Sequence, residues 1–595
     1  MTSTFISVFA GFLQIVFSGA QGVSVDPGQL KPPASTSSEK DKCTVSGRVA
    51  SMQTGEPLKK ATLHLTRRGE SRSTNGSWES TGYSGTSGPD GSFKFESVEP
   101  GEYSLSGEKP GYIQTEYGSK NGMFGGTRLK LQPAQQLTDL KLQLVAQATV
   151  SGRVLDDDGD PVGGVSVEAV GRVWGQGGKP RFFPVGQGST DDTGAFRIAN
   201  LRPGKYYFAA QSNRQQMMGM REAPATPGKP DIQPVRTFYP SSLDRASASA
   251  VELKSGQDMP GVDIRMRSVE TFHIRGKLAD GLPESTGRPT FLMLMPQGDD
   301  SPSFMFGGGL VAKDRTFEFG GVAPGSYVIS MMGNATGQQF ARQAVEVGSA
   351  DVNGVVITTQ STFIIRGAVE LQGMLSGSSK DKSLESVQVM LTPDDDSVIM
   401  FNTSNAMTKA DGTFTLERVT PGKSRVRVMN EPEGSYVKSI RFGNQETLGK
   451  TLDLTQAAGG EIRVVLHSGA AEVSGTVQTK QESTSAGDSS ALVPATSASI
   501  MLIPEDLTLN GGSVHTSGTN QSGAFTAKGL APGVYYALAY QADEYRNFND
   551  PAVLKQLVDK GTKVEVKEND KQQIQLTLLP ADDLQAALTA AGVDN

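Results

Sequence analysis

Apolar residues recur at alternate positions in short runs along this chain, and one arrangement of runs occurs five times. Each copy has a Phe and, seven residues later, a Pro-Gly dipeptide, with apolar residues alternating around these anchors. Alternation is the period of a β-strand with one buried face, and Pro-Gly marks a turn. The pattern predicts hairpins whose Phe, and whose Tyr after Pro-Gly, lie in the core. These hairpins are expected at residues 90–103, 193–206, 314–327, 411–424 and 522–535.

Two copies depart from this pattern. Ser424 stands in the fourth copy where the others have Tyr, and Arg315 stands in the third where the others have Gly. Glycine readily adopts the left-handed backbone conformation that a residue with a Cβ disfavours. We therefore expect the first turn of the third copy to have a different conformation.

Three further strands complete each copy. Opening strands read Val-Ser-Gly-Arg-Val or a variant of it, at residues 45–49, 150–154, 274–278, 365–369 and 473–477. Second strands are predicted at 61–66, 165–170, 291–295, 387–391 and 499–503, and closing strands at 140–144, 262–266, 355–358, 462–466 and 574–578. Units of roughly 90 to 125 residues with short strands and frequent turns are typical of β-sandwiches. The predicted fold class is all-β, a tandem array of about five Greek-key β-sandwiches.

The repeats divide the chain into predicted domains. We expect a signal peptide at 1–20, a flexible spacer at 21–41, sandwiches at 42–146, 147–268, 269–360, 361–468 and 469–580, and a tail at 581–595. Short helices are expected only at pieces such as 551–559 and 582–591. Because each unit is long enough to bury its own core, we expect independent beads joined by short linkers.

These motifs resemble those of a known family. Val-Ser-Gly-Arg-Val followed by a Gly-x-Pro turn (residues 55–57 and 159–161), then Asp-Gly-x-Phe and Pro-Gly-x-Tyr, is similar to the carboxypeptidase regulatory-like domain of bacterial repeat proteins. The resemblance implies a prealbumin-like (transthyretin-like) sandwich akin to Cna B-type and carbohydrate-binding-like folds. It also implies a non-catalytic extracellular module and no single ligand.

Composition and charge narrow the classes of partner. The 595 residues include 70 Gly, 56 basic and 63 acidic residues, which leaves a net charge of −7 without long runs of either sign. This balance argues against binding of nucleic acid through its phosphates. The one cysteine, Cys43, cannot form an intrachain disulfide, and we interpret it as a structural thiol.

The beginning of the chain predicts export. Residues 5–17 form an apolar run, and Ser18-Gly19-Ala20 places small residues at the −3 and −1 positions of a cleavage site. No Lys or Arg precedes Lys31, so an uncleaved anchor is the alternative, and membrane contact is expected only through that segment. The predicted location is secreted, periplasmic or at the cell surface, with processing after Ala20.

The residues that carry enzyme chemistry are scattered. The four His residues fall in different repeats, so no spacing for a metal site exists, and we predict no cofactor, no metal and no enzymatic activity. The acidic run at 156–160 lacks the Gly and Glu of a calcium loop. We interpret it as a turn between strands.

Aromatic residues in the variable regions are the remaining candidate ligand contacts. A sugar ring stacks on exposed Trp or Tyr, which makes Trp78, Trp174, Tyr239 and Tyr545 the candidates. The predicted function is an exported, non-catalytic binding or scaffold protein. Its partner is expected to be a surface protein or an extracellular polysaccharide, and the alternative is carbohydrate binding by one or more modules.

Overall fold

The computed structural model describes residues 38–591 with internal gaps. The gaps are 69–71, 75–76, 80, 120–125, 175–179, 213–230, 280–289, 298–305, 333–338, 374–383, 386, 395–402, 456–459, 481–491, 510–513 and 542–549. The predicted signal peptide and most of the spacer lie outside the described residues. Within the described part, the chain is mostly β-strand, with a short 3-10 helix, η1 (Glu39–Asp41), and two α-helices, α4 (Pro551–Val558) and α5 (Ala581–Ala590). The predicted all-β class is confirmed, and both helices lie where we expected them.

Five hydrophobic clusters define five modules, numbered here in chain order. Their buried members fall within 43–144, 148–266, 272–357, 365–466 and 471–576. Each cluster lies between the two sheets of one sandwich. The tandem array is therefore confirmed, and the boundaries given above stay a prediction.

Modules 1 and 2 contain the following strands. Module 1 has β1 (Cys43–Ser51), β2 (Thr62–Arg67), β3 (Arg72–Thr74), β4 (Ser77–Glu79), β5 (Gly82–Thr86), β6 (Ser92–Val98), β7 (Gly101–Glu108), β8 (Thr115–Glu116), β9 (Leu129–Leu131) and β10 (Gln136–Leu144). Module 2 has β11 (Ala148–Leu155), β12 (Val165–Trp174), β13 (Pro180–Ser189), β14 (Ala195–Leu201), β15 (Gly204–Ser212), β16 (Asp231–Pro234), β17 (Thr237–Phe238), β18 (Val251–Leu253), β19 (Asp258–Met259) and β20 (Ile264–Arg265).

Modules 3 to 5 repeat the plan. Module 3 has β21 (Ser268–Leu278), β22 (Phe291–Pro296), β23 (Phe306–Leu310), β24 (Thr316–Val322), β25 (Gly325–Met332), β26 (Gln339–Phe340), β27 (Arg342–Val347) and β28 (Val352–Ile357). Module 4 has β29 (Gln360–Ser361), β30 (Phe363–Gln372), β31 (Gln388–Pro393), β32 (Ser404–Met407), β33 (Thr413–Val419), β34 (Lys423–Met429), β35 (Ser435–Phe442), β36 (Gln445–Glu446), β37 (Leu452–Asp453) and β38 (Glu461–Ser468). Module 5 has β39 (Ala471–Lys480), β40 (Leu492–Pro494), β41 (Ala498–Pro504), β42 (His515–Gly518), β43 (Ala524–Leu530), β44 (Gly533–Gln541), β45 (Thr562–Val566) and β46 (Lys571–Thr577).

The opening strand organises the first sheet of every module. In module 1, β1 pairs antiparallel with the first hairpin strand β6 and parallel with the closing strand β10. A Cβ at Gly47, in the middle of β1, would collide with the carbonyl oxygen of Leu140 on β10. Gly152, Gly276, Gly367 and Gly475 meet a closing-strand carbonyl in the same way. The Gly of Val-Ser-Gly-Arg-Val is therefore required by this close approach.

The turn before each hairpin has one geometry in all five modules. In module 3, the backbone N–H of Ala312 donates to Thr316 O, and that of Arg315 donates to Ala312 O. The equivalent bonds occur in the other four turns. Arg315 has φ +68°, close to the +78° of Gly412. Our expectation of a different turn in the third copy is therefore wrong, because the hydrogen bonds hold Arg315 in the left-handed conformation.

The predicted core aromatic residues are confirmed. The Phe before Pro-Gly and the Tyr after it are at most 8% exposed in every module that has them. Each Tyr hydroxyl donates to the carbonyl four residues earlier, as Tyr327 does to Ala323 O at 2.9 Å. Burial raises the pKa of Tyr327 to about 12. Module 4 has the shorter Ser424 at this position, and Ser424 is buried as well.

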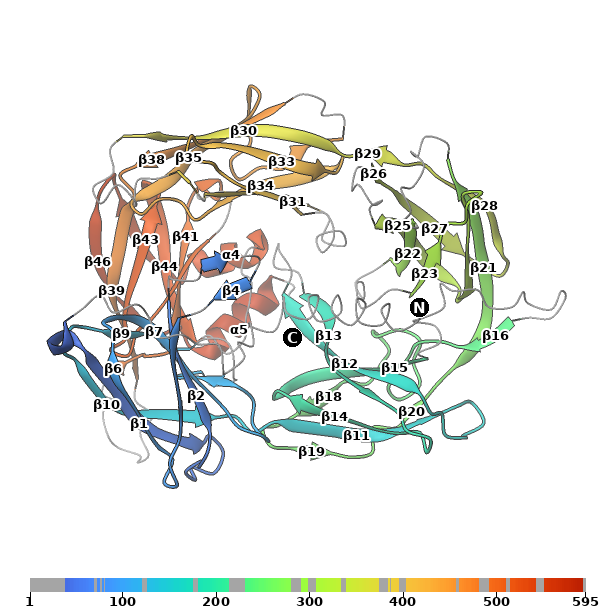
Figure 1. Ribbon diagram of the computed structural model, residues 1–595, viewed down its shortest axis with the longest axis horizontal. Helices are drawn as coiled ribbons and strands as arrows, with labels where there is room; N and C mark the ends of the chain where they lie inside the picture. The colour runs from blue at the N-terminus through green and yellow to red at the C-terminus, as the bar shows by residue number, and fades with distance from the viewer. Residues whose placement is uncertain are drawn as a thin grey trace.

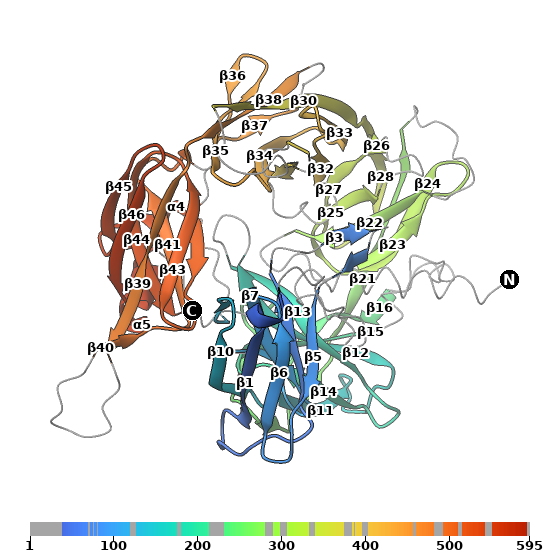
Figure 2. The same ribbon diagram turned by 60° about the vertical axis from the view of Figure 1, so that its left-hand side comes forward.

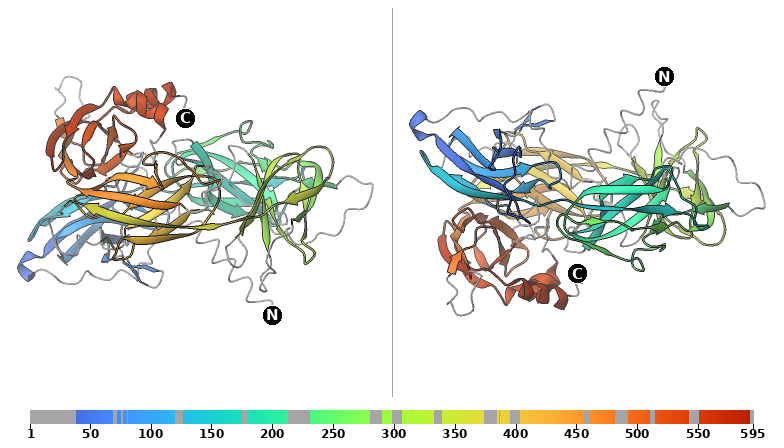
Figure 3. Two further views of the ribbon diagram at one scale, coloured as in Figure 1. Left: turned by 90° about the horizontal axis from the view of Figure 1, so that it is seen from above. Right: turned by 90° about the horizontal axis from the view of Figure 1, so that it is seen from below.

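The five modules follow one another around a ring (Figure 1). They remain distinct in the turned view of Figure 2. In Figure 3, modules 5 and 1 lie on opposite sides of module 4, so the ring resembles one turn of a shallow spiral. We expected beads joined only by linkers, and the structure differs because neighbouring modules share backbone hydrogen bonds.

Main-chain pairing forms several of the junctions. β16 pairs with β21 between modules 2 and 3, and β26 pairs with β29 between modules 3 and 4. Between modules 4 and 5, the N–H groups of Gly469 and Ala470 both donate to Gly434 O. Strand pairs of this kind restrict the angle between neighbouring sandwiches.

Modules 1 and 5 close the ring. Arg128 forms an isolated parallel bridge with Asn520. Lys130 N–H donates to the Gln521 side chain at 3.1 Å, and Gln521 Nε2 donates back to Lys130 O at 3.0 Å. The hydroxyls of Thr127 and Ser497 lie 3.0 Å apart. We call these contacts, at residues 127–130 and 496–521, the closure contact.

The two helices cover the outer face of one sheet in module 5. Val553 and Leu557 of α4 and Leu588 of α5 pack with Met501 and Leu538 of β41 and β44. Asp550 caps α4 by accepting from the Ala552 N–H. Among the described residues, no helix has the length and hydropathy needed to cross a membrane.

We expect Arg315→Gly to stabilise module 3 by about 0.5–1 kcal/mol, because glycine adopts positive φ without the cost of a Cβ. Gly412→Ala in the equivalent turn is the control. It should destabilise module 4, because its Cβ would collide with the Val369 carbonyl oxygen. Native-state hydrogen exchange of each module in the full chain measures both effects. If module 3 were less stable in Arg315→Gly than in the wild type, the result would contradict the prediction that positive φ at Arg315 is unfavourable.

The closure contact predicts an intrachain crosslink. We expect Thr127→Cys combined with Ser497→Cys to form a disulfide under mild oxidation, because the two hydroxyls lie 3.0 Å apart. A shift in non-reducing gel mobility detects the closed loop, and mass spectrometry identifies the pair. Thr127→Cys combined with Thr455→Cys, an exposed position of module 4, is the control. Equal crosslinking rates in the two variants would show that the ring is open.

Candidate functional site

The aromatic candidates are distributed over three modules. Trp78 lies on β4 opposite Ser73, and Trp174 ends β12. The side chains of both Trp residues, and the whole of Tyr545, lie outside the described residues. Tyr239 is half-buried and packs against the core of module 2. The one candidate with a described side chain thus contributes to a core, and the four residues stay a prediction as ligand contacts.

The acidic run of module 2 caps a turn. The Asp156 carboxylate accepts the N–H groups of Asp158 and Asp160 at 3.0 and 2.9 Å. Asp157 accepts the N–H of Ser268, the first residue of β21, at 2.8 Å. In the part of the chain that the structure describes, no group of three His, Cys, Asp or Glu side chains could hold a metal ion.

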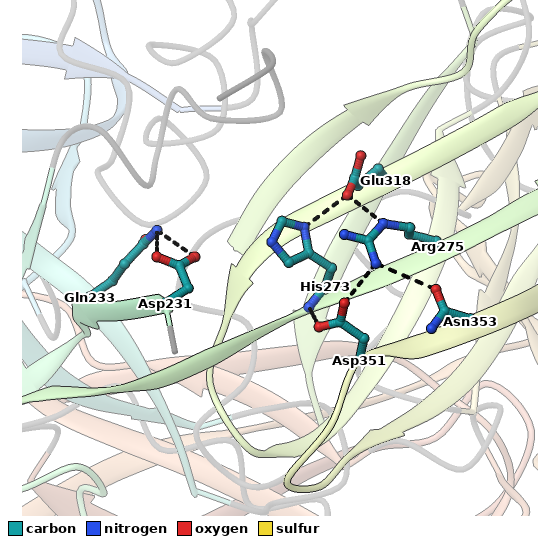
Figure 4. A network of polar contacts seen from close by, with 7 residues as sticks. All are labelled: Asp231, Gln233, His273, Arg275, Glu318, Asp351 and Asn353. Carbon is teal, nitrogen blue, oxygen red and sulfur yellow. Dashed lines mark hydrogen bonds and ion pairs between the residues drawn. The ribbon is translucent and has the colours of Figure 1, made fainter. Parts of the chain in front are cut away.

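A dense polar network covers one sheet of module 3 (Figure 4). Arg275 donates to Glu318 and Asp351, both at 2.7 Å, and His273 Nδ1 lies 2.8 Å from Glu318. The His273 N–H and the Arg275 guanidinium lower the pKa of Asp351. His273 and Arg275 lie on β21, Glu318 lies on β24, and Asp351 directly precedes β28, so the network ties three adjacent strands together. We interpret it as a structural clamp.

Cys43 also has a structural environment. Its side chain is buried in module 1, and its thiol donates to Gln132 O at 3.0 Å. Burial raises the pKa of this thiol. A buried thiol with a raised pKa is less reactive than an exposed one, which fits the predicted structural role.

A groove lies where module 4 meets module 5. Its volume is about 680 Å³. β34 and β35 of module 4 form most of its walls, through Val426, Val428, Met429 and Val437 among others. His515 and Lys528 face it from module 5. Grooves between domains are common places for ligands, and we take this one as the candidate functional site.

The groove exists because one strand of module 4 changes sheets. In module 3, β27 pairs with the second hairpin strand β25 from Gly325 to Ser330. In module 4, β35 pairs instead with β38 in the opposite sheet. Only the two-residue strand β37 remains beside the hairpin strand β34, at Lys423 and Ser424. The edge of β34 from Val426 to Met429 therefore borders the groove.

Charged groups stand around an apolar floor. Burial raises the pKa of Glu431 and lowers the pKa of His515. Lys528 bonds Glu433 at 2.6 Å across the junction, which raises the pKa of Lys528. Val426 and Ile440 are buried beneath them. This arrangement can hold an apolar chain by burial and orient it through charges at the rim.

The sequence of β34 contains a signal for this site. Lys423, Arg425 and Arg427 alternate with Ser424, Val426 and Val428 along β34. Charged residues at alternate positions are typical of edge strands. Ser424 distinguishes the fourth copy of the repeat from the other four. No local sequence pattern, however, indicates that β35 joins the opposite sheet.

Two stretches of the chain, residues 44–145 and 149–231, match the family model of the carboxypeptidase regulatory-like domain. The resemblance found in the motifs is therefore confirmed for these two stretches, which lie in modules 1 and 2. No curated relative matches the chain.

Solved structures that are similar to this chain include two pilins and part of a collagen binding protein. GBS52, the minor pilin of Streptococcus agalactiae, is 12% identical, with 40% of this chain and 99% of that chain covered and a TM-score of 0.22. BcpA, the major pilin subunit of Bacillus cereus, is 9% identical over 72% and 99%, with a TM-score of 0.14. Two B repeat units of the Staphylococcus aureus collagen binding protein are 12% identical over 71% and 99%, with a TM-score of 0.13. Similarities at this level carry no argument about binding or assembly.

The half-buried His515 predicts a pH dependence of stability. Because its pKa is lowered in the folded chain, the unfolded chain binds more protons between that value and about 6.5. The contribution of His515 is fully present above about pH 6.5 and is lost as the pH falls through this window. Glu431 acts in the opposite direction, since its pKa is raised.

We therefore expect His515→Asn to reduce the loss of stability of module 5 between pH 7.5 and 5.5. Urea unfolding of the full chain, followed by hydrogen exchange in β42, measures this change. His273→Asn, in module 3, serves as the control. An identical acid response of the wild type and His515→Asn in module 5 would contradict the prediction.

Proposed function

We propose that this chain is an exported, non-catalytic scaffold that binds partners at the cell surface or in the periplasm. The observation that carries the proposal is the closure contact, which joins the first and last modules. A closed frame fixes the surfaces at its junctions before any partner arrives. Fixing a surface in advance lowers the ordering cost of binding.

The groove between modules 4 and 5 supports a binding role. Its floor is apolar, and its rim carries Glu431, Glu433, His515 and Lys528. The Lys528 ammonium is already paired with Glu433, and His515 is held towards its neutral form by burial. Such groups position a ligand rather than activate a nucleophile.

The proposed export rests on the apolar run at 5–17 and on Ser18-Gly19-Ala20. The proposed partner is a surface protein, and an extracellular polysaccharide is the alternative. Carbohydrate binding depends on Trp78, Trp174 and Tyr545, and it is tested as a separate arm below.

The proposal predicts where the chain is found and how it begins. We expect a C-terminally tagged chain in the periplasm, in the medium or at the surface of intact cells, with Gln21 as the first residue. Fractionation, protease treatment of intact cells and N-terminal sequencing measure this. A soluble cytoplasmic chain that retains Met1 would overturn export.

A binding experiment distinguishes a protein partner from a polysaccharide partner. Purified chain is applied to arrays of glycans and of recombinant surface proteins, with Trp78→Ala and Trp174→Ala as variants. Binding to proteins that both variants retain supports the scaffold. Glycan binding that either variant loses would replace it with carbohydrate recognition.

A further inference from the structure

We propose that the edge of β34 binds an extended polypeptide segment as an added antiparallel strand. The inference rests on the proposed binding function and names the class of partner. Among the described residues, β37 pairs with β34 only at Lys423 and Ser424. No described strand pairs with Arg425–Met429 on that side. A strand edge of this kind offers main-chain donors and acceptors to an incoming strand.

In modules 1 to 3, a strand of the same module pairs with the edge that corresponds to Arg425–Met429. Counted from the Gly of Pro-Gly, Arg427 and Val428 correspond to Ser106 and Gly107 of module 1. There, β8 pairs with both residues. In module 2, β17 pairs with the corresponding Ala209 and Ala210. Module 3 uses β27, which reaches Ser330 at the position of Arg427. Modules 1 to 3 thus supply this strand from their own chain.

The strand of module 1 defines the chemistry of the occupant. In β8 and its flanks, Ile113 and Thr115 are 4% and 0% exposed, and Tyr117 packs against the core. Glu116 lies opposite Ser106. The inward positions are therefore apolar or Thr, and an acidic residue occupies the alternate position.

The groove of module 4 is complementary to that pattern. Val426 is buried in β34 and Val428 packs half-buried against the core of module 4, and Arg425 and Arg427 alternate with them. A strand placed as β8 is placed in module 1 would set its acidic residue opposite Arg427. Its inward side chains would enter the groove between Val428 and Val437. Opposite charges directly across a strand pair are favourable.

The dimensions fit a short segment. Five residues, Arg425 to Met429, span about 13–17 Å at roughly 3.3 Å per residue. The volume of about 680 Å³ accommodates several side chains. His515 and Lys528 of module 5 form the outer wall, so the bound segment would contact both modules.

A synthetic peptide copied from residues 111–119, Gly-Tyr-Ile-Gln-Thr-Glu-Tyr-Gly-Ser, is the probe. We expect saturable binding to the full chain by fluorescence anisotropy and slower amide exchange at 425–429. A peptide with Thr115→Pro, which lacks one N–H and the inward Thr, should not bind. A peptide with Glu116→Lys should bind about 1.4- to fivefold more weakly, since a cross-strand charge pair contributes about 0.2–1 kcal/mol.

Two matched variants of the full chain locate the site. Met429 lines the groove and is 46% exposed, so Met429→Arg should leave the fold intact and weaken peptide binding about tenfold. Met407 on β32 is 55% exposed and does not line the groove, so Met407→Arg should bind as the wild type does. Unchanged exchange at 425–429, or equal binding of the Pro peptide, would overturn the proposal.

Two further results separate this inference from its premise. A concentration-dependent dimer in sedimentation that Met429→Arg abolishes would assign the edge to a second copy and overturn a peptide partner. Failure of the peptide with an exported chain that binds surface proteins removes this inference alone. A cytoplasmic chain whose groove still binds the peptide overturns export and leaves the strand-addition site in place.

Discussion

The parallel pairing of the first and last strands of each module is the constraint on which the rest of the architecture depends. Because β1 and β10 run in the same direction, the chain enters a module at one end and leaves it at the other. Sandwiches built this way follow one another end to end. The pairing needs the glycine of the opening strand, since a side chain at Gly47 would occupy the place of the Leu140 carbonyl. One glycine per repeat thus permits the parallel pairing that lets the modules follow one another in a row.

Much of each module could be predicted from the sequence because its determinants are local. The Phe, the Pro-Gly and the Tyr lie within one hairpin, and their burial follows from a period of two. Arg315 shows the limit of this reasoning. Its preference against positive φ is about 1–2 kcal/mol, and the hydrogen bonds of the turn and the packing of the hairpin outweigh it.

The parts that could not be predicted depend on contacts between distant segments. β35 has the alternation of a strand, and alternation does not say which of two sheets a strand will join. Likewise, the closure contact consists of ordinary Thr, Lys and Gln residues that any loop could carry. The candidate groove depends on the first of these features and on the contact between modules 4 and 5, since β35 borders it and module 5 forms one wall. The four aromatic candidates were chosen by residue type alone, and residue type does not place side chains together.

The closure contact has a mechanical consequence. It consists of a few hydrogen bonds between partners about 370 residues apart in sequence, whereas each module is held by a buried core. Hydrogen bonds near a surface contribute about 0.5–1.5 kcal/mol each, so tension along the chain would break the closure contact well before any core. The ring would then lengthen into a row of five sandwiches without a single module unfolding. Such a chain would extend under tension and close again when the tension is released. Closure would be favoured because the two halves of the closure contact belong to one chain and stay at a high effective concentration.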